Sequence, residues 1–77
     1  MTTAHRTPNW LIKVYGSEHG IPYFHIHCPS GRASVAIANG AVLAGSVPKR
    51  VLNEAWTWAE EHAEELLAEW HRLNPNL

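Results

Sequence analysis

Length, composition and charge exclude several classes of protein before any motif is considered. The chain has 77 residues and a net charge of −1 at pH 7. This length fits one domain, and this charge excludes a generally basic protein that binds nucleic acid by itself. The single cysteine excludes an internal disulfide framework. No apolar run reaches the ~18 residues of a membrane span, and residues 1–9 lack the hydrophobic segment of a signal peptide. We therefore expect a cytoplasmic protein that does not bind a membrane.

The first half of the chain predicts short antiparallel strands. Residues 1–9 show no periodicity and are expected to form a flexible tail. Alternating apolar and polar residues, or β-branched and aromatic residues, predict strands at 10–15, 22–28, 32–38 and 41–44. Asn39-Gly40 is typical of a tight hairpin turn, because both residues accept a positive φ. Hairpin connections throughout predict an antiparallel meander.

The second half predicts one long helix over residues 48–73. Pro48 is favoured in the first turn of a helix, and Asn74-Pro75 ends it. Between these points, apolar residues recur at alternating steps of three and four and form one stripe: Leu52, Trp56, Ala59, Ala63, Leu66, Trp70 and Leu73. With residues 74–77 as a C-terminal tail, the sequence predicts one α+β domain over residues 10–73. Its three- to four-stranded antiparallel meander packs against the single long helix.

The same patterns predict which side chains are buried. The expected core consists of apolar residues on one face of each element: Leu11 or Ile12, Val14, Phe24, Ile26, Val35, Ile37, Leu52, Trp56, Ala59 and Ala63. Cys28 shares a strand face with Phe24 and Ile26, so we expect it to be a small buried hydrophobic residue. His25 and His27 alternate onto the opposite, polar face of that strand.

Three stretches of the chain resemble a known bacterial family, the domain of unknown function numbered 4160. They are Val14-Tyr15-Gly16-Ser17-Glu18-His19, Pro22-Tyr23-Phe24-His25-Ile26, and the helix from Pro48 through Glu64-Glu65-Leu66-Leu67-Ala68-Glu69-Trp70. Together they cover about residues 11–70. The family pattern reads acid-His-x-Pro-Pro-His-aromatic-His. It is filled here by Glu18, His19, Pro22, Phe24 and His25, whereas Ile21 replaces the first proline and Tyr23 replaces the first strand histidine.

The resemblance implies a class of partner and no particular reaction. Genes of the family commonly lie beside another small uncharacterised gene, in an arrangement like a toxin–antitoxin pair. It therefore implies a small non-enzymatic protein-interaction module whose partner is the product of the adjacent gene.

The histidines support a second hypothesis from the residues alone. His25 and His27 leave one strand face about 7 Å apart, a separation that suits two ligands of a tetrahedral zinc ion, and His19 could supply a third. Glu18 could orient His19 as an acid orients a catalytic histidine. The candidate catalytic residues of a minimal hydrolase or nuclease are therefore Glu18, His19, His25 and His27. The alternative is that these histidines are simply polar residues on a solvated face, with no cofactor bound.

The length of the helix predicts an interface. A helix over residues 48–73 spans about 39 Å, whereas a six-residue strand covers only about 20 Å. The far end of the apolar stripe is then expected to contact a partner, through Leu66, Leu67, Trp70 and Leu73. The partner is a second copy of the chain or the adjacent gene product. The alternatives are that the N-terminal tail covers this end or that the helix ends early.

Charged residues on and near the helix offer one more candidate site. Six of the seven acidic residues lie on the predicted helix, where a solvated face is the simple explanation. Lys49 and Arg50 stand at its start and, with Arg32, are the candidate residues for binding an anion.

Overall fold

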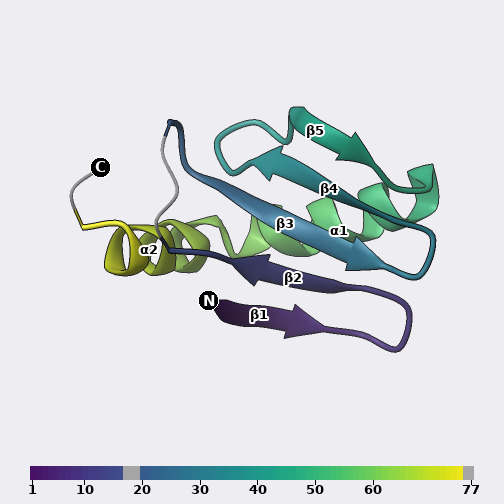
Figure 1. Cartoon of the computed structure of the whole chain (residues 1–77), viewed down its shortest axis with the longest axis horizontal. Helices are drawn as coiled ribbons and strands as arrows, with labels where there is room; N and C mark the ends of the chain where they lie inside the picture. The colour runs from purple at the N-terminus through teal and green to yellow at the C-terminus, as the bar shows by residue number, and fades with distance from the viewer. Residues whose placement is uncertain (17–19, 76–77) are drawn as a thin grey trace.

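In the residues that the computed structural model describes, 1–16 and 20–75, five antiparallel strands form one sheet and two helices lie on one of its faces (Figure 1). The strands follow chain order across the sheet: β1 (Thr2–Arg6), β2 (Leu11–Val14), β3 (Tyr23–Cys28), β4 (Gly31–Ala36) and β5 (Val42–Ser46). The helices α1 (Lys49–Glu61) and α2 (Ala63–Leu73) follow. The predicted α+β class and the meander are confirmed, whereas the number of strands and the single helix are corrected.

The prediction of a flexible tail over residues 1–9 is wrong, because this segment contains strand β1. Thr2 pairs with Val14 and Arg6 with Leu11, and the register shifts between Thr3 and His5. This bulge explains why the segment shows no simple alternation, since one extra residue shifts the side-chain period. The connection to β2 is closed by a hydrogen bond of 2.8 Å from the amide of Thr7 to the carbonyl of Trp10.

The predicted helix over 48–73 is interrupted at His62. Its backbone leaves the helical region, with φ −119° and ψ 25°, and its Nδ1 atom lies 2.8 Å from the carbonyl oxygen of Trp58. The His62 ring also stacks on the Trp58 ring, with centroids 4.1 Å apart. A side chain that bonds a carbonyl of the preceding turn competes with the helical ladder, so the interruption needs neither glycine nor proline.

The core lies between the sheet and the helices. Most of the predicted core is confirmed as buried: Ile12, Val14, Phe24, Ile26, Val35, Ile37 and Ala59. Leu52, Trp56 and Ala63 are only partly buried and pack against it. Trp10, Ala55, Leu66 and Trp70 complete the buried cluster. Cys28 was expected to be buried, but it is half-buried at the end of β3.

The predicted turn at Asn39-Gly40 is present between β4 and β5. Gly40 has φ 75°, and its amide donates to the carbonyl of Ala36 at 2.9 Å. A β-carbon at this glycine would lie only 2.8 Å from the ring of Trp56. The turn therefore requires glycine for its backbone angle and also for its contact with α1.

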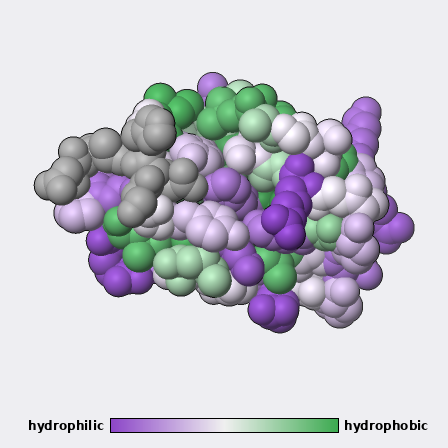
Figure 2. All heavy atoms as spheres, in the orientation of Figure 1, coloured by the Kyte–Doolittle hydropathy of each residue, from purple (hydrophilic) through white to green (hydrophobic). Residues whose placement is uncertain are grey.

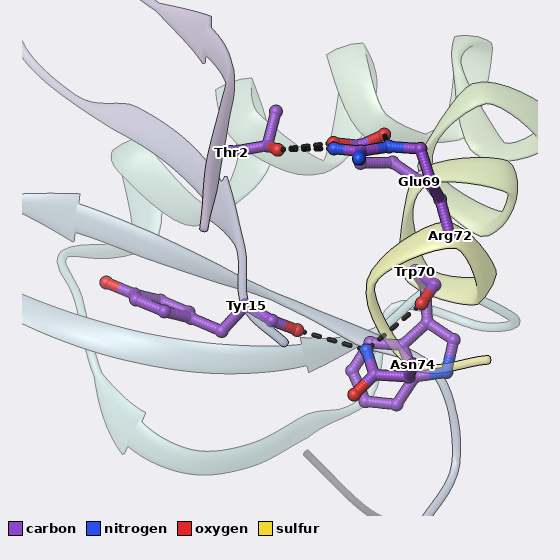
Figure 3. A network of polar contacts seen from close by, with 6 residues as sticks. All are labelled: Thr2, Tyr15, Glu69, Trp70, Arg72 and Asn74. Carbon is purple, nitrogen blue, oxygen red and sulfur yellow. Dashed lines mark hydrogen bonds and ion pairs between the residues drawn. The ribbon is translucent and has the colours of Figure 1, made fainter. Parts of the chain in front are cut away.

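Polar contacts tie the two ends of the described chain to the fold (Figure 3). The Thr2 hydroxyl in β1 donates to the Glu69 carboxylate in α2. Asn74, which was expected to begin a C-terminal tail, is instead only 4 % exposed. Its side-chain amide donates to the carbonyl oxygens of Tyr15 and Trp70, each at 3.0 Å. No helix in the described part of the chain is long and apolar enough to span a membrane.

Candidate functional site

The histidines of β3 lie on the open face of the sheet, away from the helices. Phe24 and Ile26, which alternate with them, are completely buried, and the Phe24 ring lies parallel to the ring of Trp56 in α1. His25 and His27 are half-exposed on the other side of the strand. The predicted assignment of the two strand faces is therefore confirmed.

Strand pairing gives the two histidines fixed neighbours on this face. His25 stands between Lys13 of β2 and Ser34 of β4. His27 stands between Leu11 of β2 and Arg32 of β4. Two cations from the adjoining strands thus flank the histidine pair.

Tyr15, just after β2, completes the cluster. Its ring is nearly perpendicular to the His25 ring, at a centroid distance of 4.6 Å, and its hydroxyl lies 3.3 Å from Nε2 of His27. The centroids of the two histidine rings are 6.3 Å apart, and Nδ1 of His25 lies 3.4 Å from the Ser34 hydroxyl. The rings are therefore held by neighbouring side chains.

Three shallow hollows adjoin this cluster. One of about 250 Å³ is lined by Tyr15, His25, His27 and Arg32. A second of about 270 Å³ shares His27 and Arg32 and extends to Arg6. A third of about 170 Å³ shares His25 and Arg32 and extends toward β5. His25, His27 and Arg32 thus stand where the hollows of the open face meet.

The electrostatics of the face favour an uncharged imidazole beside fixed cations. Burial lowers the pKa of His27, and the charges of Arg32, Lys13 and His25 lower it further. At neutral pH His27 can therefore accept a proton or a hydrogen bond. The carboxylates of the described residues all belong to α1 and α2, so none of the strands carries one.

The described residues do not assemble the predicted zinc site. Among them, no group of three or more His, Cys, Asp or Glu side chains is close enough to hold a metal ion. His25 and His27 could supply two ligands, whereas a protein zinc site uses three or four. The other predicted members, Glu18 and His19, lie outside the described residues.

The interface predicted on the helix assumed that the far end of its apolar stripe is not covered by the chain itself, and this assumption is wrong. Leu66 and Trp70 are each only 1 % exposed within the chain itself, and the Trp70 ring contacts the Tyr23 ring at a centroid distance of 5.0 Å. Leu67 and Leu73 are partly buried against the same core. The core of the chain itself, including Tyr23 of β3, thus provides the cover that was expected from a partner.

The three predicted anion-binding residues lie on different elements. Arg32 is on β4, on the open face beside His27. Lys49 and Arg50 begin α1, where the Arg50 guanidinium pairs with the Glu54 carboxylate at 3.2 Å. Only Arg32 belongs to the histidine cluster.

Strand β5 forms a second candidate surface, which the sequence reasoning missed. All five of its residues are exposed, and Val42 and Leu43 each expose 46 % of their surface. Figure 2 shows apolar side chains along the edge where β5 lies and hydrophilic ones over the middle of the sheet. The signal in the sequence is the absence of any charged residue between positions 41 and 48.

Comparison with known proteins identifies a family and no activity. A family model described as a domain of unknown function (DUF4160) matches residues 9–71. No curated protein matches the chain, and no solved structure matches it.

Proposed function

The chain belongs to the DUF4160 family of domains of unknown function, and we propose that it is a small non-enzymatic interaction module, one member of the toxin–antitoxin-like pair that the family resemblance implies. It binds its protein partner through the open edge of β5, and not through the helix surface that the sequence suggested.

The observation that carries this proposal is the exposure of β5. In the described sheet β5 pairs with β4 on one side and has no strand on the other. An edge strand presents unpaired backbone N–H and C=O groups, and proteins usually protect such an edge with charges, proline or a covering segment. Residues 42–46 contain no charge and no proline, and all of them are exposed. The one protective feature of the described strand is a bulge, where the register against β4 shifts between Ser34 and Val35.

The chemistry of β5 defines the partner that fits it. An added strand gains main-chain hydrogen bonds along the edge, while its side chains contact those of the host strand. Val42 and Leu43 offer apolar contacts, and the neighbouring residues are Ala41, Ala44 and Gly45. The partner is therefore expected to contribute an extended, uncharged strand rich in apolar residues.

The test uses the purified product of the adjacent gene. We expect a complex whose mass by light scattering is the sum of the two chains, and an affinity at least about tenfold weaker for Leu43→Lys, which places a charge on the interface. Asn53→Lys adds the same charge at an exposed position of α1 and should bind as the unmodified protein does. Equal affinity for both variants would reject the β5 interface. Self-association lost in Leu43→Lys would assign the edge to a second copy instead.

The histidine cluster favours one second candidate, a minimal His-dependent hydrolase or nuclease. Two imidazoles share a hollow with Tyr15 and Arg32, so an acid, a base and a fixed cation face one space. A positioned acid or base contributes about 10²–10⁴-fold to a rate.

This candidate is tested by cleavage of an end-labelled RNA oligonucleotide in the presence of a chelator. A hydrolase that uses the pair should lose at least about 100-fold of its rate in His25→Gln and in His27→Gln. Cleavage at an unchanged rate in both variants would show that a contaminating nuclease is responsible and would reject this candidate.

A further inference from the structure

The open face of the sheet combines cations, aromatic rings and shallow hollows. We infer that this face binds single-stranded nucleic acid, with Arg6, Lys13 and Arg32 against the phosphates and the rings of Tyr15 and His25 against the bases. Such binding requires neither a partner at β5 nor a cleavage step.

The cations border the rings on both sides. Arg6 of β1 is opposite Leu11, Leu11 is opposite His27, and His27 is opposite Arg32. This row crosses four strands, and adjacent strands lie about 4.8 Å apart, so Arg6 and Arg32 stand about 14 Å from each other. Lys13 lies in the next row, opposite His25. Several phosphates of one extended strand can therefore be contacted at once.

The rings give the face a second means of contact. Tyr15 and His25 line the same hollow, and both are half-exposed. Aromatic side chains on an open sheet are a recurrent platform on which unpaired bases stack, and a cationic groove with such rings tolerates many sequences. An acidic peptide would meet the same cations but would gain nothing comparable from the rings.

The net charge of −1 disfavours binding of a nucleic acid, but the charges are unevenly distributed over the two layers of the fold. Six glutamates lie on α1 and α2, in the layer behind the sheet (Figure 1). The open face carries Arg6, Lys13 and Arg32 without a carboxylate from any described strand. A phosphate approaching the open face therefore meets nearby cations, and the more distant carboxylates are screened over about 10 Å at 0.1 M salt.

The ligand is single-stranded, because none of the described elements is placed to enter a duplex groove. Readers of the major groove insert a helix or a two-stranded ribbon. The helices here carry the acidic residues and pack against the sheet, and the described strands all belong to one continuous sheet.

The experiment measures binding of a fluorescent ten-nucleotide oligo-U by anisotropy, with a gel of the same samples to show intact RNA. Three phosphate contacts predict a slope of about −2 for log K against log salt, since each contact on a single strand contributes about −0.7. Arg32→Gln should flatten the slope by about 0.7. Arg50→Gln, at a side chain that is 87 % exposed on α1, should leave affinity and slope unchanged.

A second pair of variants tests the rings. Tyr15→Leu should weaken binding at least about fivefold at an unchanged salt slope, because stacking is lost while the charges remain. Tyr15→Phe keeps the ring and should bind as the unmodified protein does. As a control, circular dichroism should show that each variant is folded. Absence of binding at 50 mM salt, or equal affinity of Tyr15→Leu and Tyr15→Phe, would overturn the inference. Equally strong competition by polyglutamate and by oligo-U would assign the face to acidic protein segments and would overturn it as well.

Discussion

The two outer strands of the sheet, β1 and β5, differ in their side-chain contacts with the helices. At β1, Thr2 is bonded to Glu69 (Figure 3), and the His5 ring stacks on the Trp58 ring with centroids 4.5 Å apart. At β5 every residue is exposed and none is charged. One edge is thus fastened to both helices by side chains, and the other is left open.

The difference supports the proposal that β5, and not β1, binds a partner. Natural sheets protect their edges against unwanted pairing, and this chain does so at β1, where it also places His5 and Arg6. The chain uses Glu69 and Trp58, from two different helices, to hold β1. Strand β5 is exposed and uncharged, and only a register shift against β4 interrupts it, which supports the proposal that a partner covers this edge.

Truncating Trp70, the buried side chain of α2, should have the largest effect on the free energy of unfolding. Trp70 is 1 % exposed and lies one residue after Glu69, so Trp70→Ala empties the core beneath this end of the sheet. We expect a loss of about 3–5 kcal/mol of unfolding free energy, measured by urea denaturation. The loss should be the same at all protein concentrations. A concentration-dependent loss would show that Trp70 is covered by a partner, as its place in the helical stripe had suggested.

A smaller effect is expected when only the polar link between β1 and α2 is cut. Arg72 donates to the Glu69 carboxylate at 2.6 and 2.8 Å, and Thr2 donates to it as well. Because Arg72 is largely exposed, solvent screens the pair, and Glu69→Gln should cost only about 0.5–1 kcal/mol. Hydrogen exchange should quicken in β1 and stay unchanged in β5. The reverse pattern would contradict the assignment of the fastened edge.

The same link makes the fastened edge sensitive to acid. The hydrogen bonds from Arg72 and Thr2 lower the pKa of Glu69 from 4.5 to about 2. The unfolded chain therefore binds this proton at a higher pH than the folded chain does. The stability from this carboxylate is present above about pH 4.5 and is lost as the pH falls toward 2. Glu69→Gln should therefore lose less stability than the unmodified protein over that pH range. Identical acid transitions in the two proteins would contradict the lowered pKa of Glu69.

The smallest effect on stability is expected at the open edge. Leu43 is 46 % exposed, so Leu43→Lys should change the unfolding free energy by no more than about 0.5 kcal/mol. A loss above 1 kcal/mol in the isolated chain would show that the chain itself covers Leu43.

Local patterns predicted the elements that follow a regular period, and irregular backbone caused the errors. Alternation in 22–28 correctly placed Phe24 and Ile26 in the core and the histidines outside it. Strand β1 was missed because its bulge shifts the period between Thr3 and His5. The interruption at His62 was missed because it depends on contacts with Trp58, which no spacing rule reveals.

The candidate site was predictable only in part for the same reason. Spacing put His25 and His27 on one face, whereas Tyr15, Lys13 and Arg32 join them through strand register. Register depends on pairing between distant segments, and the sequence gives no direct measure of it. The exposed β5 had a readable signal in its lack of charge, but its position at an edge required the topology.

Hydrogen exchange of the protein with and without the purified product of the adjacent gene locates the edge that binds the partner. We expect the amides of Val42–Ser46 to exchange more slowly in the complex and those of Thr2–Arg6 not to change. Protection confined to α2 or β1, or a complex that leaves β5 exchanging as in the free protein, would contradict the assignment of β5 as the partner-binding edge.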